Sequence, residues 1–414
     1  MTNDRVLLLA ATTAYQTADF RRAADAMGVE VVLGSDRCHV LAEVWPEGAL
    51  ALDFRDPARA AAQIADADAA ARLGGIIATD EKTAVIAARA AERLGLPFNP
   101  VAATRATADK LRLRQRLAEA RVPQPAFRVA AIDGDPTALA GELGFPVVIK
   151  PRHLSTSRGV MRADDAGELR DRFARLAVLL ADPELIARDP EAAGAVLIEA
   201  FVAGPEVAFE GLLRGGRLQA LALFDKPDPL DGPFFAETIY VTPSRLPAAT
   251  QQAIEARVAE AAAAIGLCEG PVHAELRLGD GDPVVIEVAA RSIGGLCGRA
   301  LRFGAGISLE ELIIAHALRR ELTCTRTAEA TGVFMLPVPR AGVLRAIDGI
   351  EAAAAVSGVR EVTITARVGE ELTPLPEGNK YLGFVFAAAE QPDAVVTALR
   401  HACAALRFSI APLL

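Results

Sequence analysis

The sequence predicts an α/β protein that is built from several domains. Its 414 residues exceed the usual size of a single domain. Over the first hundred residues, apolar runs typical of strands alternate with helical stretches, and this order favours a parallel sheet. Further along, strands at 271–278 and 283–289 flank a turn signal at 279–282, which predicts an antiparallel hairpin. The chain should therefore combine a parallel α/β unit with antiparallel structure.

Apolar periodicity places the first elements of the chain. The turn after the first strand, at 11–15, contains no glycine. The glycine-rich fingerprint of a dinucleotide site is therefore missing, and this unit is not expected to bind NAD or FAD. The strands expected here are 5–11, 29–33 and 75–78, and the helices are 18–27 and 81–94.

The remaining elements alternate less regularly. A helix is expected at 108–120, followed by a proline-containing break at 122–125. The segment 182–191 is rich in charge and proline, so we expect a surface loop there. The other expected strands are 147–150, 196–200, 207–213, 218–224, 332–338, 359–366 and 382–388, and the other helices are 164–181, 248–265 and 392–405.

Composition and charge exclude several classes of function. Lys+Arg 44 against Asp+Glu 53 gives a net charge of -9, whereas nucleic acids and anionic membranes need a basic surface. No apolar run reaches the roughly 18 residues of a transmembrane helix, and the polar start shows no signal peptide. The five cysteines form no CxxC pair, so neither a disulfide framework nor a zinc site is expected. We expect a soluble, cytoplasmic protein that binds neither nucleic acid nor membrane.

Lysine is rare in this chain, because only five of the 44 basic residues are lysine. A chain that supplies surface charge with arginine has reason to keep lysine where a compact ammonium must approach a phosphate oxygen. Lys150 fits this idea, because it ends the apolar run 145–150, which reads as a buried strand. Lys82, early in a helix, is expected to be an ordinary solvated residue. The five are Lys82, Lys110, Lys150, Lys226 and Lys380.

The predicted hairpin brings two acidic residues together. If its turn centres on Gly281, Leu278 lies opposite Val284, and Glu275 lies opposite Glu287. Directly opposed side chains have Cβ atoms about 4.5–5.5 Å apart, and like charges there are destabilising. A shared divalent cation would remove this repulsion, whereas a register slip of one residue would separate the two carboxylates. From the hairpin alone, an exposed pair on a sheet edge is an equally good interpretation.

Two further segments have the chemistry of anion binding. Arg291 follows Glu287 by four residues, and its guanidinium can bind a phosphate or a substrate carboxylate. Gly294 and Gly295 permit close approach of the backbone to a ligand. The loop 153–160 contains small hydroxyl residues and a glycine, whose N–H groups can cover phosphates. This loop lacks the Walker A pattern, and by itself it would read as an ordinary polar loop.

Taken in order, these segments resemble the ATP-grasp superfamily, and within it the carboxylate–amine ligases that include the bacterial L-amino-acid ligases. The resemblance covers nearly the whole chain and implies an ATP-grasp fold with a Rossmann-like N-terminal parallel-sheet domain and a C-terminal α/β domain. The implied divisions are an N-terminal domain (1–105), a linker helix (106–122), a small lid subdomain (123–202), a large subdomain with the metal site (203–328) and the C-terminal domain (329–414). The segments that carry the resemblance are 80–100, 109–117, 145–160, 198–206, 236–244 and 380–386.

The resemblance also implies roles for individual residues. Glu275 and Glu287 would hold Mg²⁺ or Mn²⁺, and Arg291 and Lys150 would be catalytic. Contacts to ATP would come from Lys110, Lys150, Ser155, Ser157, Gly159, Glu199, Ala200, Val202 and Glu206. Contacts to the substrates would come from Glu237, Tyr240, Arg291, Gly294 and Gly295.

Three positions depart from the family pattern. Many members carry asparagine where this chain has Ala289, which leaves the number of bound metals open. Some relatives have histidine where this chain has Tyr240, which leaves the amine substrate open. The loop 153–160 is poor in glycine and contains Arg158.

The function that the resemblance implies is ligation. ATP and Mg²⁺ would activate a small-molecule carboxylate, expected to be that of an amino acid, as an acyl phosphate, and an amine would then form an amide or dipeptide. A homodimer is suggested only by the resemblance. Two alternatives stay open: a purine-biosynthesis or bicarbonate-using ligase with the same nucleotide site, and a nucleotide-binding regulator without turnover. Ala289 gives the regulator some support, whereas the presence of both glutamates and both lysines speaks against it.

Overall fold

The computed structural model describes residues 4–12, 14–36, 48–279 and 281–413. Its N-terminal unit is a parallel sheet with the strand order β3-β2-β1-β4, so the predicted alternation of strands and helices is confirmed. The strands are β1 (Arg5–Leu9), β2 (Glu30–Ser35), β3 (Ala49–Ala51) and β4 (Gly75–Ala78). The helices are α1 (Thr17–Met27), α2 (Pro57–Ala70), α3 (Glu81–Leu94) and α4 (Val101–Thr107).

Helix α3 has clear end signals, and they fix its first residue. The Asp80 side chain accepts hydrogen bonds from the backbone N–H groups of Lys82 and Thr83, which satisfies donors that the helix itself cannot pair. Gly95 ends the helix in the left-handed conformation, at φ 65°. Glu81 is therefore in the first turn of α3, where it accepts a hydrogen bond from Arg291.

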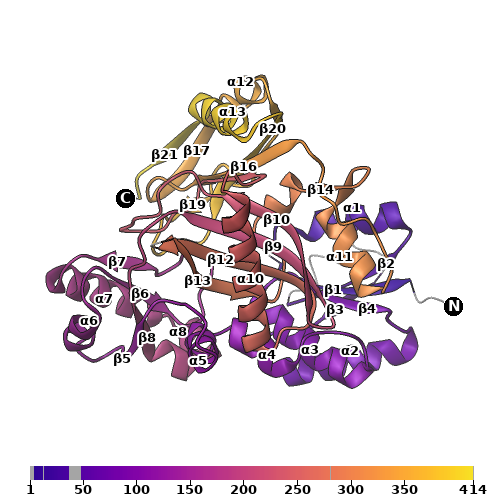
Figure 1. Ribbon diagram of the computed structural model, residues 1–414, viewed down its shortest axis with the longest axis horizontal. Helices are drawn as coiled ribbons and strands as arrows, with labels where there is room; N and C mark the ends of the chain where they lie inside the picture. The colour runs from indigo at the N-terminus through magenta and orange to yellow at the C-terminus, as the bar shows by residue number, and fades with distance from the viewer. Residues whose placement is uncertain (1–3, 13, 37–47, 280, 414) are drawn as a thin grey trace.

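A second sheet, which we call the lid sheet, has four antiparallel strands in the order β5-β8-β6-β7. Figure 1 shows it at the lower left, beside the N-terminal unit. Its strands are β5 (Phe127–Ala131), β6 (Val147–Pro151), β7 (Met161–Ala163) and β8 (Ala195–Ala200), and its helices include α6 (Thr137–Leu143) and α7 (Ala166–Leu180). Helix α5 (Lys110–Glu119) connects this sheet to the N-terminal unit.

The prediction of a surface loop at 182–191 is wrong. The structure has two short helices there, α8 (Pro183–Arg188) and α9 (Pro190–Ala193). Each helix has proline at its first position, where the missing N–H costs nothing, and an aspartate as its N-cap. The residues that suggested a loop are therefore helix-start signals.

The centre of the molecule is an antiparallel sheet of eight strands in the order β13-β12-β9-β10-β11-β16-β20-β18. Helix α10 (Ala248–Ile265) packs on one face, and its buried side chains meet the strands in a common apolar core. The strands are β9 (Glu206–Arg214), β10 (Arg217–Asp225), β11 (Ile239–Thr242), β12 (Glu269–Gly279), β13 (Asp282–Ala289), β16 (Ala330–Pro337), β18 (Val359–Ile364) and β20 (Tyr381–Ala389).

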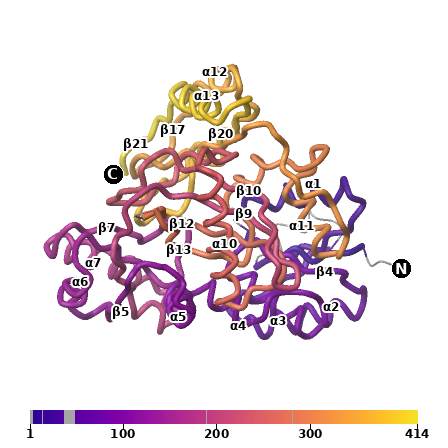
Figure 2. Tube along the Cα trace, viewed as in Figure 1, coloured from indigo at the N-terminus to yellow at the C-terminus, as the bar shows by residue number. Residues whose placement is uncertain are grey.

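The same sheet continues across the expected boundary at 328/329, because β11 pairs with β16. The C-terminal part adds helices α12 (Ile350–Ala354) and α13 (Pro392–Ala405) and a small sheet of β17 (Gly342–Asp348), β19 (Glu371–Leu372) and β21 (Arg407–Ala411). The tube in Figure 2 shows this part at the top, above the central sheet. In the sequence, four short elements lie between β13 and β16: η1 (Cys297–Ala300), β14 (Arg302–Phe303), β15 (Ile307–Ser308) and α11 (Leu309–Ala317).

The hairpin of β12 and β13 pairs the two glutamates as expected, although its register differs. Glu275 lies opposite Glu287, but Leu278 lies opposite Pro283 rather than Val284. The register shifts by one residue next to Glu275, at a β-bulge. The bulge therefore compensates for the different turn and keeps the two carboxylates opposite each other.

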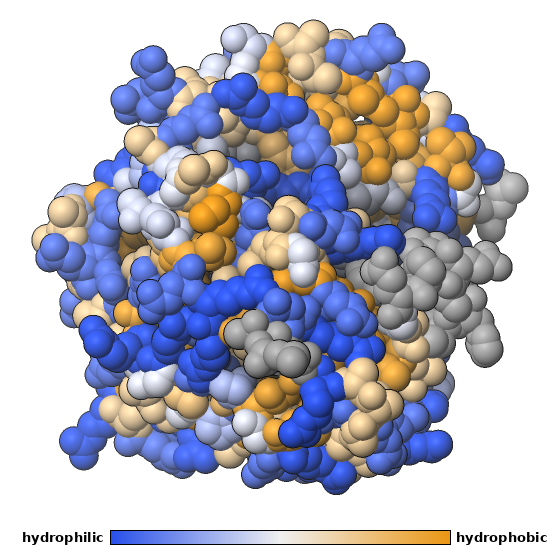
Figure 3. Space-filling model, turned by 90° about the vertical axis from the view of Figure 1, so that its right-hand side faces the viewer, coloured by the Kyte–Doolittle hydropathy of each residue, from blue (hydrophilic) through white to orange (hydrophobic). Residues whose placement is uncertain are grey.

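The surface of the molecule is varied. Hydrophilic residues cover much of the face in Figure 3, and apolar residues gather in a smaller area at its upper right. Within the described residues, none of the helices is long and apolar enough to cross a membrane. Cys38 and His39, adjacent in the sequence, lie outside the described residues.

Candidate active site

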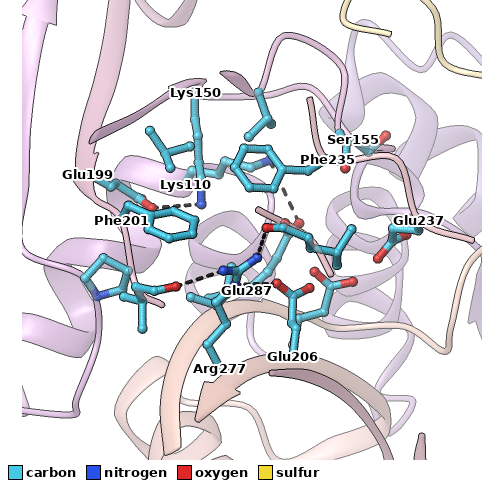
Figure 4. Close-up of a pocket in the computed structure, with 18 of the residues that line it drawn as sticks. Lys110, Lys150, Ser155, Glu199, Phe201, Glu206, Phe235, Glu237, Arg277 and Glu287 are labelled. Carbon is cyan, nitrogen blue, oxygen red and sulfur yellow. Dashed lines mark hydrogen bonds and ion pairs between the residues drawn. The ribbon is translucent and has the colours of Figure 1, made fainter. Parts of the chain in front are cut away.

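A pocket lies between the lid sheet and the central sheet, as Figure 4 shows. It contains about 690 Å³ of empty space, part of it open to solvent. Its walls come from strands β6 and β8 on the lid side, from β9, β12 and β13 on the other side, and from the start of α5. Elements separated by more than a hundred residues in the sequence therefore meet in one cavity.

Most of the residues that the sequence singles out line this pocket. They are Lys110, Lys150, Ser155, Ser157, Glu199, Ala200, Val202, Glu206, Glu237, Glu275 and Glu287. Five others are not part of its lining: Gly159, Tyr240, Arg291, Gly294 and Gly295. The lining thus includes the expected ATP contacts except Gly159, together with both expected metal carboxylates.

Glu199, at the end of β8, is the centre of a buried ion-pair network. Its carboxylate accepts from Arg114 Nε at 2.7 Å and Nη2 at 3.2 Å, and it lies 2.8 Å from Lys150 Nζ. Burial alone would raise the pKa of Glu199, but the charges of Arg114 and Lys150 outweigh burial and lower the pKa to about 2. Arg114 also donates to the main-chain carbonyl of Ile286, so one side chain ties α5 to both walls of the pocket.

Replacing Arg114 with methionine should destabilise the protein strongly. The change leaves Glu199 buried with only Lys150 as its partner, and we expect a loss of about 3 kcal/mol in the free energy of unfolding. Because the folded pKa of Glu199 is depressed, this stabilisation exists above about pH 4.5 and disappears as the pH falls toward 2. Urea unfolding at pH 7 and pH 3 measures both effects. The control Arg128→Met removes an exposed ion pair with Glu142 and should cost less than about 1 kcal/mol; equal losses would contradict the network.

Lys110 lies at the junction of three elements. It is the first residue of α5, and its backbone N–H donates to the carbonyl of Arg152 at the end of the lid strand β6. Its ammonium donates to the carbonyl of Leu154 at 2.6 Å and lies 3.9 Å from a Glu287 oxygen. Figure 4 shows Lys110 and Lys150 together on the lid side of the pocket, with Glu287 on the other side. Two positive charges therefore face a carboxylate across the cavity.

Three carboxylates surround a lysine that sequence reasoning left without a role: Glu206 and Glu275 are on the central sheet, and Glu237 lies just before β11. Lys226 Nζ lies 2.7 Å from Glu206, 2.6 Å from Glu237 and 3.2 Å from Glu275. Burial would lower the pKa of Lys226, but these carboxylates raise it well above its usual value. Oxygens of Glu206, Glu237 and Glu275 lie within 4.8 Å of one another, a geometry that could also hold a cation. The available signal was the scarcity of lysine, since Lys226 is one of only five.

The carboxylates of this cluster do not titrate alike. Burial, together with the charge of Glu275, raises the pKa of Glu237 to about 7, although Lys226 opposes that shift. The pKa of Glu275 moves the other way, because Lys226 and His273 outweigh the cost of burial. His273 itself has a pKa raised to about 9: burial lowers it, but Glu210 and Glu275 raise it more. Of Glu237 and Glu275, Glu275 is therefore the one held more firmly in its charged form.

Tyr240 lies beside the pocket, on β11. Its hydroxyl donates to Glu237 and lies 3.4 Å from Glu275, while Lys226 Nζ lies 4.9 Å from the centroid of its ring. Burial and the neighbouring carboxylates raise the pKa of Tyr240. The hydroxyl therefore remains a hydrogen-bond donor that orients Glu237.

Arg277 is another charged residue of the pocket that no sequence pattern indicates. It donates to Glu206 at 2.8 Å and to the carbonyl of Val202 at 2.8 Å, and its guanidinium lies 5.0 Å from the centroid of Phe201. Phe201 and Phe235 also line the pocket and supply apolar walls, at the left and at the top of the view in Figure 4. Flat aromatic walls beside fixed polar groups are typical of a pocket for a planar ring.

Arg291 is held by the N-terminal unit. Its Nε and Nη2 donate to one oxygen of Glu81, at 2.9 Å and 2.5 Å. Glu81 would have a raised pKa from burial alone, yet Arg291 lowers it below the usual value. No local pattern in the sequence indicates Glu81, because 210 residues separate the two partners.

The two glycines near Arg291, Gly294 and Gly295, have different surroundings. Gly295 has a φ of 61°, and an added Cβ would lie 2.9 Å from the Phe384 ring. Gly294 has open space beside it apart from Arg291, whose Nη1 would lie 4.0 Å from an added Cβ. The chain therefore passes close to Arg291 on one side and to a C-terminal aromatic residue on the other.

Three family models match separate parts of the chain. The ATP-grasp N-terminal domain matches residues 20–98, the ATP-grasp domain matches 143–300, and L-amino acid ligase C-terminal domain 2 matches 334–411. Together these models cover three of the four strands of the parallel sheet, the strands on both sides of the pocket and most of the C-terminal part.

The chain belongs to the ATP-grasp superfamily. Within it, the crystal structure of the L-amino acid ligase from Bacillus licheniformis superposes with a TM-score of 0.81 at 26% identity, over 99% of this chain and 100% of that one. The D-alanine–D-alanine ligase of Aromatoleum aromaticum is 32% identical over 51% of this chain and 64% of its own length. The alanine–anticapsin ligase of Bacillus subtilis is 27% identical over 50% of this chain and 46% of its own length. The chain is thus an ATP-grasp ligase similar to the L-amino-acid ligases, and it aligns with less than two thirds of the last two relatives.

ATP-grasp ligases use ATP with a divalent metal, and one departure of this ATP-grasp ligase bears on that metal. Ala289 is buried and lies opposite His273, two residues beyond Glu287. Its methyl group offers no ligand oxygen. Glu275 and Glu287 are then the carboxylates of the hairpin that can face a metal from the central sheet.

Proposed function

We propose that this chain joins a carboxylate to an amine through an acyl phosphate, with ATP as the phosphoryl donor, and that the product is an amide or a dipeptide. The observation that carries the proposal is the pocket itself. The opposed carboxylates Glu275 and Glu287, the ammonium groups of Lys110 and Lys150, and the lid loop all line it. The likeness to an L-amino acid ligase over the whole chain supports an amino acid as one substrate.

The nucleotide would lie under the lid. Glu199, Ala200 and Val202 would contact adenine at the hinge between the two sheets, with Phe201 and Phe235 as apolar walls. Glu206 would lie near the ribose. The phosphates would meet Lys110, Lys150, Ser155 and Ser157. Gly159, expected from the sequence as a further contact, instead donates its N–H to the carbonyl of Pro376 behind the loop.

The residues present fit a magnesium ion. Glu275 and Glu287 are opposed on the hairpin, and both line the pocket that would hold the phosphates. Mg²⁺ is commonly held by one or two carboxylates together with substrate phosphates and water. Bound there, Mg²⁺ would neutralise charge that spreads over the phosphate oxygens during transfer.

The remaining polar groups would position the reactants. The substrate carboxylate would attack the γ-phosphorus in line, the bond from that phosphorus to the bridging oxygen would break, and ADP would leave. Lys150 and Arg291 would supply fixed positive charge where negative charge develops. Glu237 would accept hydrogen bonds from the amine substrate, and Tyr240 would keep Glu237 oriented. Gly294 and Gly295 would leave room for a substrate beside Arg291. The amine nitrogen then attacks the acyl carbon, and phosphate leaves.

The chain would act on small molecules. Its net charge of -9 gives no general attraction to nucleic acids or to anionic membranes, and we expect neither as a partner. We also propose the cytoplasm as its location, a homodimer as its assembly, and the five divisions expected from the sequence as its functional units.

An acceptor panel tests this function. Purified protein with ATP and Mg²⁺ is given amino acids in pairs, bicarbonate, or phosphoribosyl amines, and ADP release and the mass of any product are followed. We expect ADP release with amino-acid pairs, matched by a product that has lost one water. ADP release only with bicarbonate or phosphoribosyl amines would contradict the proposal, and so would ATP binding without ADP release under every condition.

A further inference from the structure

The lid loop is fastened from behind by the C-terminal part of the chain. Residues 373–380 connect β19 to β20 and reach the back of the loop 153–160. The Gly159 N–H donates to the carbonyl of Pro376 at 2.8 Å. Arg158 Nε donates to the carbonyl of Glu377, also at 2.8 Å. Neighbouring residues of the loop are therefore bonded to neighbouring carbonyls of a segment more than 200 residues away.

A second contact fastens the lid helix α7 to the same segment. Arg175 Nε and Nη2 donate to the two carboxylate oxygens of Glu377, at 2.5 Å and 2.8 Å. The Arg175 guanidinium also lies 5.1 Å from the centroid of Phe234, which belongs to the large subdomain. Glu377 therefore holds the lid at two points: its carbonyl binds the loop and its side chain binds the helix.

The segment 373–380 is itself a tight turn. The Gly378 N–H donates to the carbonyl of Pro374 at 2.8 Å, and a Cβ at Gly378 would lie 1.8 Å from the carbonyl oxygen of Thr373. Only glycine fits so close an approach. The turn thus presents the carbonyls of Pro376 and Glu377 to the lid in a fixed arrangement.

The lid loop has two faces with different partners. Ser155, Thr156 and Ser157 line the pocket, whereas Arg158 and Gly159 do not and instead meet the segment 373–380. Thr156 and Ser157 have φ values of 59° and 55°, in the left-handed region that is costly for residues with a Cβ. Such a conformation persists only where the surroundings hold it, and the contacts behind the loop supply that support.

We propose that the segment 373–380 is a latch that keeps the lid closed during the reaction, with Arg158, Arg175 and Glu377 as its positioning residues. This inference rests on the proposed function for what lies beneath the lid, an acyl phosphate. Water that enters attacks the acyl carbon, the carbon–oxygen bond to phosphate breaks, and the original carboxylate and free phosphate result. ATP is then consumed without an amide. The latch also explains why Arg158 departs from the glycine-rich pattern of the family: its guanidinium binds the carbonyl of Glu377 on the side of the loop that faces away from the pocket.

The test uses the full chain with Arg158→Ala and Glu377→Ala combined. Hydrogen exchange of the segment 153–163 in nucleotide-free protein should become about tenfold faster, because contacts to charged groups that protect the closed loop are lost. The dissociation rate of a fluorescent ADP analogue, mant-ADP, should also rise about tenfold. The fraction of ADP released without amide should rise several-fold.

Two further variants separate the latch from a general loss of stability. Glu142→Ala removes an exposed ion pair with Arg128 in the same lid subdomain, away from the latch, and should leave all three readouts unchanged. The exchanged pair Arg175→Glu with Glu377→Arg should keep the wild-type dissociation rate, whereas Glu377→Arg alone should not. Exchange and dissociation rates equal to those of the wild type in the double alanine variant would overturn the latch.

The outcomes also distinguish this inference from the proposed function. A wild-type protein that forms no amide with any acceptor would contradict the ligase, while the exchange of the segment 153–163 would still decide the latch. Amide formation with an unchanged ratio of ADP to amide in the double variant, together with unchanged exchange, would overturn the latch and leave the ligase standing.

Discussion

Glu287→Gln should lower the rate of ADP release by at least about a hundredfold, since removal of one fixed electrostatic contact to a transition state commonly costs that much. Glutamine keeps the shape of the side chain and removes its charge, so the hairpin should stay folded. The side chain is partly exposed, and the ion pair it makes, with Lys110 at 3.9 Å, is long. Steady-state assays of ADP release at increasing Mg²⁺ concentration provide the measurement, and a higher Mg²⁺ requirement is expected.

A matched control is available on the neighbouring strand. Glu269, at the start of β12, pairs with Arg319 and lies outside the pocket lining. Glu269→Gln should therefore release ADP at the wild-type rate. Wild-type turnover in Glu287→Gln would refute its assignment as a metal ligand.

Lys226→Met should destabilise the folded protein by about 3–5 kcal/mol near pH 8, because three carboxylates lose the cation that they surround. In the variant, burial and the charge of Glu275 raise the pKa of Glu237 without the opposing charge of Lys226. At Glu237 the folded state then binds more protons than the unfolded chain, so stability falls as the pH rises through the raised pKa. The loss should consequently be smaller at pH 5.5 than at pH 8.

Urea unfolding of both proteins at the two pH values measures this effect. Lys380 offers the comparison, since it pairs with Glu370 at an exposed position. Lys380→Met should cost less than about 1 kcal/mol at either pH. A Lys226→Met loss that is equal at pH 5.5 and pH 8 would show that the carboxylates are not what Lys226 neutralises.

Much of the fold could be predicted from local patterns. The helices α3, α10 and α13 have the bounds that the sequence predicts, because apolar periodicity and end signals agree there. Shorter elements were missed: β11 has four residues, and β5 has exposed side chains that hide its apolar alternation. In α8 and α9, proline and aspartate were read as loop residues although they begin helices.

The site residues also differ in whether local sequence patterns predict them. The pairing of Glu275 with Glu287 follows from strand alternation and a turn, both of them local features, although the bulge beside Glu275 could not be foreseen. Arg114, Arg277 and Glu81 could not be found, because each gains its meaning from a partner far along the chain. Lys226 lies between these two cases. The rarity of lysine is visible in the sequence, but the three carboxylate partners of Lys226 are not.

Oxygen transfer tests the acyl phosphate most directly. A carboxylate substrate labelled with ¹⁸O is incubated with the protein, ATP, Mg²⁺ and an amine, and the phosphate and nucleotide are analysed by mass. If the carboxylate attacks the γ-phosphorus and the amine then expels phosphate, one labelled oxygen must appear in inorganic phosphate for each amide formed, and none in the nucleotide. Label in AMP, or amide formation with unlabelled phosphate, would contradict this route.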